Sequence, residues 1–365
     1  MRRRIFYVLG GPSQPELETK KQHGEQPLSE FNVFVERNDA QLVTTDQFGG
    51  GHALSLQRRL VLANALRRRA SEYDIIITSG EDIGIPVALA SMMLRTPKPV
   101  WIILHGSYLQ GRKFSAIAPL LRRARHVQFL CLSESLRTMM IKQHGFPAER
   151  CHNAGYGVDT SFFQPRFTDH PALIVSAGSA NRDYQTLVSA VDGLEVPLRI
   201  AADSLWRPTE SGLTAEKLPG YVTAASAGSY TGLRSLYSDA SIVVVPLHPA
   251  RYACGYAVIA EAMAMGKVVI TTRTEAPSDL IVDGVTGFQV EPGDVPGLKG
   301  VIRLLLDEPQ RALAMGALGA VRMQQNFSLT AYCARIEQII EERSDVGRIT
   351  PCLTSEAHSF AVEVF

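Results

Sequence analysis

The stretch RYACGYAVIAEAMAMGKVVITT, residues 251–272, combines a helix with a strand. Ala, Met, Val and Ile dominate its first part, which is typical of a buried helix, and Gly266 marks the end of that helix. The run KVVITT follows at once and predicts a buried strand, because it is short, apolar and β-branched. A helix that leads directly into such a strand is the repeating unit of α/β proteins, in which helices cover a parallel sheet.

The same alternation runs through both halves of the chain. In the first half the predicted strands are RRIFYVLGG, AQLVTTDQ, YDIIITSG, KPVWIILHG and HVQFLCLS, and the predicted helices cover 54–70, 85–94, 115–125 and 134–144. In the second half the strands are ALIVSAG, PLRIAA, GYVTA, SIVVVPL, KVVITT and GFQV, and the helices cover 182–192, 231–238, 256–265 and 295–306. The polar segment 12–26, which contains Pro, Gly and Lys, predicts a mobile loop.

A Gly- and Pro-rich segment without periodicity, 153–171, separates the two halves. We therefore expect an α/β protein with two tandem Rossmann-like domains, 1–165 and 166–325, facing each other across a cleft. The last helical region is too long for a simple cap, so we expect a final helix, 326–345, to cross back to the first domain before a tail, 346–365. Ligands of open α/β sheets bind beyond the carboxyl ends of the strands, so functional residues should follow strands.

Composition narrows the class of protein. A chain of 365 residues with 45% apolar and 20% charged residues is typical of two soluble domains, and no apolar run reaches the ~20 residues of a membrane-spanning helix. Five cysteines without paired spacing fit a reducing cytosol and predict neither disulfides nor structural zinc. No two aspartates are separated by a single residue, so the commonest carboxylate pair that holds a metal on a nucleotide is missing. We therefore expect a cytoplasmic protein that needs no metal.

Charge is distributed unevenly along the chain. Residues 1–165 hold 21 Lys and Arg against 14 Asp and Glu, whereas residues 166–365 hold 16 against 22. A basic half can attract an anionic or lipid-linked acceptor, or a membrane surface, and peripheral contact at the inner membrane face stays open. The arginines between 58 and 69 are spread around their helix, however, which favours a solvated face. Nothing in the pattern predicts a nucleic-acid partner.

In the first half, candidate functional residues follow three of the predicted strands. Gly10 and Gly11 allow close approach of a phosphate or sugar, although such a pair is commonly only a turn. His105 ends a strand, where it can act on a sugar or simply bond a neighbouring carbonyl. Glu81 and Asp82 can bind the hydroxyls of an acceptor, but an Asp in this position is often a helix N-cap.

The second domain begins with SAGSANRDYQTLVSA, residues 176–190. Here Gly178, Ser179 and Arg182 lie between a strand and a helix and combine backbone amides with one permanent cation. This arrangement suits a diphosphate, because Arg is a bidentate donor and a helix N-terminus favours negative charge. The alternative is that Arg182 pairs with Asp183 or with solvent.

Glu261 is the unusual residue of the opening stretch. Its helix begins at Gly255, Tyr256, Ala257 and Val258, whose amides have no partner within the helix. Side chains tilt toward a helix N-terminus, so Glu261 should reach back toward these amides. A carboxylate only accepts hydrogen bonds and suits the two hydroxyls of a ribose. An acid among apolar neighbours is a poor solvated face, which favours a functional role.

The segments NAGYGVDTSFFQP, SAGSANRDYQTLVSA, SDASIVVVPL and CGYAVIAEAMAMGKVVITTRTEAPSDLIVDGVTGFQVEPGD together resemble the retaining family-four glycosyltransferases. These enzymes have the two-Rossmann type-B glycosyltransferase fold. The similarity is clear from about residue 126 to 327. In the first half it rests on strand order, on Gly10 and Gly11, and on the strand-end His105.

The resemblance implies a nucleotide-sugar donor, with UDP as the expected nucleotide, and no cofactor. Glu261 would bind the ribose, Arg182 and Gly178 the diphosphate, and the amides of 255–258 the sugar and phosphate. Further donor contacts would come from Gly10, Gly11 and Ser179. His105 and Arg182 would be the catalytic residues, and the first domain would bind the acceptor. Transfer of a hexose to a glycan, lipid or small molecule would retain the anomeric configuration without a metal.

Two positions depart from the family pattern. Ala253 stands where the family usually has a second Glu that contacts the sugar, and Arg182 stands alone where the family has an Arg and Lys pair. Arg251 or Lys113 are candidates to replace the missing cation. Two alternatives therefore stay open, namely a nucleotide-sugar epimerase on the same fold and a non-catalytic nucleotide-sugar-binding protein.

Overall fold

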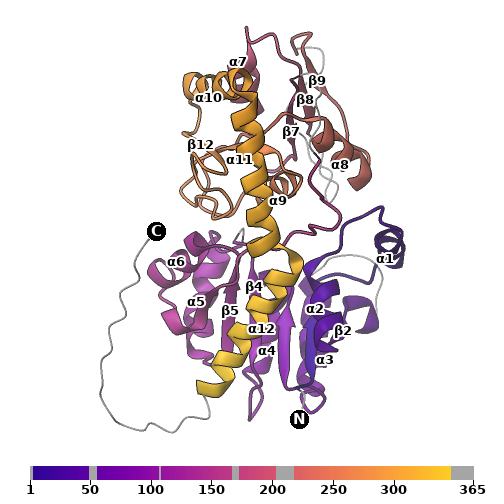
Figure 1. Cartoon of the computed structure of the whole chain (residues 1–365). Helices are drawn as coiled ribbons and strands as arrows, with labels where there is room; N and C mark the ends of the chain where they lie inside the picture. The colour runs from indigo at the N-terminus through magenta and orange to yellow at the C-terminus, as the bar shows by residue number, and fades with distance from the viewer. Residues whose placement is uncertain (1–2, 49–55, 107, 167–171, 203–217, 347–365) are drawn as a thin grey trace, which may run out of the picture.

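The computed structural model describes residues 3–48, 56–106, 108–166, 172–202 and 218–346. These residues form two α/β domains, each built on a six-stranded parallel sheet, one above the other in the view of Figure 1. The expected α/β class with two Rossmann-like domains is thus confirmed. Almost all of the predicted tail lies outside the described residues.

The first sheet has the strand order β2-β1-β3-β4-β5-β6. Its strands are β1 (Ile5–Val8), β2 (Gln41–Val43), β3 (Ile75–Thr78), β4 (Val100–Leu104), β5 (Val127–Cys131) and β6 (Cys151–Asn153). Every residue of β3 and β4 is buried, as expected for parallel strands covered on both faces. The strand order reverses between β1 and β3, and open α/β sheets bind ligands at such a point.

Helices cover both faces of this sheet and bury an apolar cluster against each. They are α1 (Pro15–Gln22), α2 (Glu30–Asn38), α3 (Leu56–Arg68), α4 (Glu81–Ser91), α5 (Arg112–Arg123) and α6 (Glu134–Lys142), with short 3-10 turns η1 (Thr45–Phe48) and η2 (Ala148–Arg150).

The second sheet has the strand order β12-β11-β10-β7-β8-β9, which reverses between β7 and β10. Its strands are β7 (Ile174–Ala177), β8 (Leu198–Ala201), β9 (Val222–Ala224), β10 (Ile242–Val245), β11 (Val268–Thr272) and β12 (Gly287–Val290). The helices around it are α7 (Tyr184–Val191), α8 (Tyr230–Asp239), α9 (Tyr256–Ala264), α10 (Val295–Asp307) and α11 (Pro309–Arg322). The opening stretch is therefore α9 followed by β11, joined at Gly266, whose φ is +74°.

The prediction of a loop over 12–26 was wrong, because this segment contains α1. Pro15 stands at the first helical positions, Glu16 and Glu18 in the first turn and Lys20 and Lys21 in the last, which complements the helix dipole. The helix has no apolar stripe that periodicity could have detected. Helix α2 and strand β6 were also not predicted.

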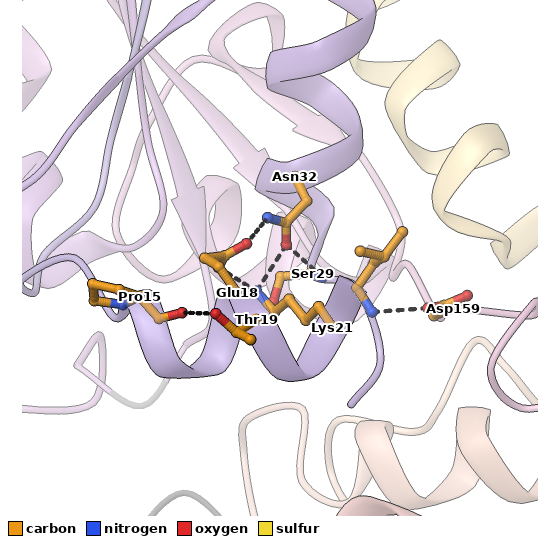
Figure 2. A network of polar contacts seen from close by, with 8 residues as sticks. Pro15, Glu18, Thr19, Lys21, Ser29, Asn32 and Asp159 are labelled. Carbon is orange, nitrogen blue, oxygen red and sulfur yellow. Dashed lines mark hydrogen bonds and ion pairs between the residues drawn. The ribbon is translucent and has the colours of Figure 1, made fainter. Parts of the chain in front are cut away.

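Side chains tie α1 to α2 (Figure 2). Lys21 Nζ donates to Glu18 Oε1 and to Asn32 Oδ1, each at 2.8 Å, and Asn32 Nδ2 donates to Glu18 Oε2 at 2.8 Å. Asn32 Oδ1 also accepts from the backbone amide of Ser29, at the start of α2, at 3.0 Å. These contacts fix α1 against the start of α2.

The last helix, α12 (Leu329–Val346), follows α11 after one π-helical turn, η4 (Met323–Phe327), and returns to the first domain (Figure 1). Its buried residues Tyr332, Cys333 and Ile336 belong to the apolar cluster on one face of the first sheet. An ion pair of 2.8 Å between Arg37 and Glu337 joins α12 to α2.

Two segments of the chain pass from one domain to the other, and they form backbone hydrogen bonds with each other. The amide of Val158 donates to the carbonyl of Phe327 at 2.8 Å, and the amide of Leu329 donates to the carbonyl of Val158 at 3.0 Å. A further contact comes from Asp279, whose carboxylate accepts from the amide of Glu134 at the start of α6 at 2.7 Å. No described helix is both long and apolar enough to cross a membrane.

Candidate functional site

A cavity of about 290 Å³ lies between the two domains, where the strand order of the second sheet reverses. The second domain lines it with the loop after β7 and with the start of α9, and the first domain adds residues that follow β4, β5 and β6. The predicted residues that it brings together are His105, Gly178, Ser179, Arg182, Gly255, Tyr256, Ala257, Val258 and Glu261.

Arg182 is fixed in the wall of this cavity by backbone carbonyls. Its Nε donates to the carbonyl of Ala177 at 2.9 Å, and its Nη1 donates to the carbonyl of Ala180 at 2.7 Å. Burial lowers the pKa of the guanidinium from its ordinary value, yet Arg stays charged at neutral pH. Asp183, one partner expected in the alternative interpretation, is not among these contacts, because it caps α7 and accepts from the amide of Thr186. A held cation at the edge of a cavity suits an anionic ligand.

Gly178 is required beside this guanidinium for two reasons. Its φ is +89°, in the region that favours glycine, and a β-carbon there would lie 2.6 Å from Arg182 Nη2.

We expect Gly178→Ala to displace the guanidinium and to weaken nucleotide binding by roughly tenfold, since backbone strain of this kind costs about 1–3 kcal/mol. Isothermal calorimetry with UDP checks this expectation. The matched control is Gly193→Ala, which also replaces a glycine with positive φ (+70°) but lies outside the cavity. Equal losses in the two variants would contradict the assignment.

The start of α9 supplies backbone donors to the same cavity. Gly255 is the N-cap, with φ of +75°, and the first bond within the helix runs from the amide of Ile259 to the carbonyl of Gly255 at 3.0 Å. The amides of the residues between them have no intrahelical partner, and Tyr256, Ala257 and Val258 all line the cavity. A β-carbon on Gly255 would lie 3.7 Å from Arg182 Nη1, so these amides and the guanidinium are neighbours. Unpaired helix amides beside a guanidinium are donors of the kind that suit an anion.

Glu261 is the one acid among the described residues that line this cavity. It is 8% exposed, and its Oε2 accepts from the hydroxyl of Tyr237 at 3.1 Å. Burial raises the pKa of Glu261 to about 8, although Tyr237 and Arg182 oppose this shift. A buried carboxyl with one partner retains acceptor capacity, which the hydroxyls of a ribose can fill.

His105 follows β4 and faces the cavity from the first domain. Its Nε2 lies 2.9 Å from the carbonyl oxygen of Ser79, which can only accept, so this nitrogen carries the proton. The contact with a neighbouring carbonyl is therefore confirmed, and the ring also lines the cavity, whereas its action on a sugar stays a prediction.

Glu81 does not line the cavity and is 4% exposed. Its carboxylate accepts from the amides of His105 at 2.9 Å, Gly106 at 3.2 Å and Tyr108 at 3.4 Å. The direct contact with an acceptor that the sequence suggested is thus replaced by a positioning role, in which Glu81 holds the loop that carries His105.

We expect Glu81→Gln to lower the thermal midpoint by several degrees, because an amide group in place of one carboxylate oxygen leaves a backbone N–H unpaired at a cost of about 1–3 kcal/mol. The turnover number should fall as well, because the His105 loop loses its anchor. Differential scanning fluorimetry and a nucleotide-release assay measure the two effects. Glu72→Gln, whose side chain pairs with Arg69 at the surface, is the control and should change neither by a comparable amount.

Asp82 is not the N-cap of α4, because Gly80 occupies that position. Its carboxylate pairs with Arg59 at 2.6 Å and lines a second cavity, of about 320 Å³, together with Gly10 and Gly11. The structure therefore separates both glycines from the residues around Arg182, which does not support their assignment to the donor site.

Sequence reasoning missed Tyr237, which orients Glu261 and resembles an ordinary buried tyrosine of α8 in the sequence. It also missed Leu132 and Tyr156, which line the cavity from the first domain. Neither candidate for a second cation lines it, because Arg251 pairs at the surface with Glu275 at 2.8 Å and Lys113 lies on α5.

Sequence models of two protein families match this chain. The family described as Glycosyl transferases group 1 matches residues 174–308, and the one described as Glycosyltransferase Family 4 matches residues 30–162. The two matches together span most of the chain, one on each domain.

Individual relatives agree with these matches. The chain is 24% identical to an MMP alpha-(1->4)-mannosyltransferase of Mycolicibacterium hassiacum, over 89% of this chain and 82% of the relative. It is 27% identical to an alpha-D-kanosaminyltransferase of Streptomyces kanamyceticus, over 58% of this chain and 60% of the relative. The crystal structure of Anabaena HepE in complex with UDP-glucose superposes with a TM-score of 0.66 at 19% identity, covering 93% of this chain and 99% of HepE, and it shows the shared fold. The chain therefore belongs to the glycosyltransferases of group 1 and family 4, which have two Rossmann-like domains and use nucleotide-sugar donors.

Proposed function

We propose that this glycosyltransferase moves a hexose from a nucleoside diphosphate sugar to a glycan, lipid or small-molecule acceptor with retention of the anomeric configuration. UDP is the nucleotide that we expect. The observation that supports the proposal is the convergence of Arg182, the amides of α9 and Glu261 on one cavity of about 290 Å³. The two alternatives, an epimerase and a non-catalytic binder, gain no support from the relatives.

Each group in the cavity has a role that its chemistry fits. Glu261 accepts from the ribose hydroxyls, and Arg182 with the free amides of α9 binds the diphosphate. The sugar then lies toward His105, Leu132 and Tyr156 of the first domain, which line the same cavity. His105 contacts the transferred sugar with the face of its ring that the Ser79 carbonyl leaves free.

In the proposed transfer, the acceptor hydroxyl oxygen bonds to the anomeric carbon while the bond from that carbon to the diphosphate oxygen breaks. The hydroxyl proton passes to the departing diphosphate on the same face of the sugar, which preserves the configuration. Arg182 and the N-terminus of α9 stabilise the charge that develops on the diphosphate, as preorganised donors do in a site that excludes water. We propose that these groups act without a metal.

We also propose that the protein works in the cytosol. The described cysteines, Cys131, Cys151, Cys254 and Cys333, are all buried and unpaired, which suits a reducing compartment.

The test is transfer from UDP-, GDP- and ADP-linked hexoses to a panel of acceptors, with the product's anomeric configuration read by NMR. We expect acceptor-dependent release of nucleotide and a product with the configuration of the donor, with and without EDTA. An inverted product would refute retention, loss of activity in EDTA would refute metal independence, and conversion of the donor sugar without an acceptor would favour the epimerase.

A further inference from the structure

Asn181 has an unusual backbone conformation next to the donor cavity. It immediately precedes Arg182, in the loop between β7 and α7. Its φ is +58°, and it is one of three residues other than glycine with a positive φ in the described part of the chain. Among residues with a side chain, Asn and Asp adopt this left-handed conformation most readily, but it still costs free energy. A conformation that glycine would adopt without strain raises the question of what the Asn181 side chain does there.

The backbone around Asn181 pairs with the segment that follows β10. The amide of His248 donates to the carbonyl of Asn181 at 3.2 Å, and the amide of Asp183 donates to the carbonyl of Pro246 at 3.1 Å. These two hydrogen bonds lie on either side of Arg182 in the sequence. The backbone of Arg182 is therefore fixed against the neighbouring segment.

The side chain of Asn181 extends this pairing to the start of α9. Its Nδ2 donates to the carbonyl of His248 at 2.9 Å and to Sγ of Cys254 at 3.7 Å. An amide group has two N–H donors, so both contacts can form at once. Cys254 immediately precedes Gly255, the N-cap of α9. One side chain thus joins the β7–α7 loop to the helix whose first residues line the donor cavity.

Cys254 is suited to this contact. It is buried, and burial raises the pKa of its thiol, so the sulfur is uncharged at neutral pH. A neutral thiol accepts a hydrogen bond weakly and places no negative charge beside a diphosphate. The charge of Arg182 is close enough to oppose the rise of this pKa. Asn181, Arg182 and Cys254 therefore lie together beside the donor cavity.

The donor site depends on two groups that belong to different segments. The guanidinium of Arg182 is held by carbonyls of its own loop, whereas the free amides belong to α9. A β-carbon on Gly255 would lie 3.7 Å from Arg182 Nη1, so the two groups are close enough to bind one diphosphate. Preorganised donors stabilise a developing charge only while their positions match it, and small displacements are costly. A contact that fixes the spacing of the two segments therefore bears on the rate of transfer.

We infer that Asn181 is a positioning residue for the transfer reaction, and that it holds Arg182 and the N-terminus of α9 at the spacing that the leaving diphosphate requires. Asn181 is not among the residues that line the cavity, so it acts through these two groups rather than on the substrate. This inference rests on the proposed transfer and adds a residue to the donor site. It also accounts for an asparagine at a position where glycine would be free of strain.

The test removes the side chain and keeps the conformation. In Asn181→Gly the left-handed backbone is unstrained, so the change is confined to the lost contacts with His248 and Cys254. Nucleotide release is measured with UDP-glucose, GDP-mannose and ADP-glucose. We expect kcat for the preferred donor to fall roughly fivefold to tenfold, the effect of about one hydrogen bond, and the Kd for UDP to rise by less than about threefold. The matched control is Glu195→Gly, which also replaces a residue of positive φ (+52°) outside the cavity and should change neither value.

A double-mutant cycle separates positioning from general stability. If Asn181 acts through Arg182, then Asn181→Gly should lower kcat by less than about twofold in an Arg182→Ala background, in which there is no guanidinium to position. A merely structural role would lower the thermal midpoint and reduce kcat by the same factor in both backgrounds.

Cys254→Ala tests the same contact from its other side. It removes the sulfur and leaves the bond between Asn181 and His248 in place. We expect kcat to fall about threefold, less than in Asn181→Gly, because one of two contacts remains. Cys254→Ala combined with Asn181→Gly should be no slower than Asn181→Gly alone, since both changes remove one interaction.

The outcomes separate the two claims. If the wild type neither binds a nucleotide nor turns over any of the three donors, the proposed function fails, and this inference fails with it. If the wild type is active but Asn181→Gly has the kcat of the wild type, or loses as much in the Arg182→Ala background, or loses no more than Glu195→Gly, only the positioning role is refuted. Should Asn181→Gly not unfold cooperatively, Cys254→Ala decides. A loss of kcat that disappears with Arg182→Ala supports the role, and no loss, or an equal loss in both backgrounds, refutes it.

Discussion

Replacing Arg182 with Ala should reduce turnover roughly a hundredfold to a thousandfold, the range found when one preorganised donor to a developing negative charge is removed. Arg182 is the one arginine or lysine among the described residues that line the donor cavity. The carbonyls of Ala177 and Ala180 hold the Arg182 guanidinium in place, so this group needs no rearrangement as the diphosphate leaves. Charge on the diphosphate grows in the transition state, and kcat should therefore fall more than the affinity for the donor.

Steady-state nucleotide release as a function of donor concentration measures this split. Arg182→Lys should recover part of kcat, because it restores the charge without the bidentate geometry. Arg199→Ala is the matched control, since Arg199 is an exposed arginine of β8 that pairs with Asp239 at 3.7 Å away from the donor cavity. A fall of less than tenfold in Arg182→Ala, or a fall in affinity with kcat unchanged, would contradict the assigned role.

Replacing Glu261 with Gln should weaken UDP binding by roughly tenfold to a hundredfold at pH 9, since hydrogen bonds to a charged group contribute about 1.5–3 kcal/mol. The effect should depend on pH. Burial raises the pKa of Glu261 to about 8 in the empty cavity, whereas ribose hydroxyls bond best to the ionised form. Wild-type affinity should therefore rise between pH 7 and 9, by up to about tenfold per unit below the pKa.

Calorimetry at pH 7, 8 and 9 separates this effect from other groups. A phosphate with a second pKa near 6 is already ionised over this interval, and an ordinary histidine is already neutral. Glu261→Gln should show a flat profile. A wild-type affinity that is constant from pH 7 to 9 would show that the carboxyl does not gain its charge on binding.

The same carboxyl should affect stability in the opposite sense. The pKa of Glu261 in the folded state is raised above the ordinary 4.5, so its favourable contribution is present below about pH 4.5 and is lost as the pH rises through about 8. The thermal midpoint of Glu261→Gln should therefore exceed that of the wild type increasingly between pH 6 and 9. A residue that costs stability in the empty protein and strengthens binding is expected at a functional site.

The strands were predictable because parallel strands buried on both faces form short β-branched runs. IIIT in β3 and IVVV in β10 are entirely buried, and their pattern needs no tertiary information. Helix α1 was not predictable in this way, since its stability comes from the dipole and from the contacts of Lys21 and Asn32 rather than from an apolar stripe. Strand β6 has the sequence CHN, and it lacks the β-branched residue that is present in the equally short β2 and β9.

The same contrast holds for the site. Glu261 and Arg182 could be recognised in the sequence because an acid in an apolar helix and a cation in a glycine turn are unusual. The start of α9 could be recognised because the first amides of any helix lack intrahelical partners. Tyr237 looks like an ordinary buried helix residue in the sequence. Only the fold brings its hydroxyl within 3.1 Å of Glu261. Glu81 and Asp82 are adjacent in the sequence, yet one is buried under the His105 loop and the other lines the second cavity.

The most direct test of the donor site is calorimetric titration of UDP, GDP and ADP into the wild type and into the double variant Arg182→Ala with Glu261→Gln. We predict that one nucleotide, expected to be UDP, binds the wild type with a stoichiometry of one and that this binding is lost in the double variant, whose thermal unfolding remains cooperative. Binding of equal affinity in the double variant, or binding of none of the three nucleotides to the wild type, would contradict the placement of the donor between Arg182 and Glu261.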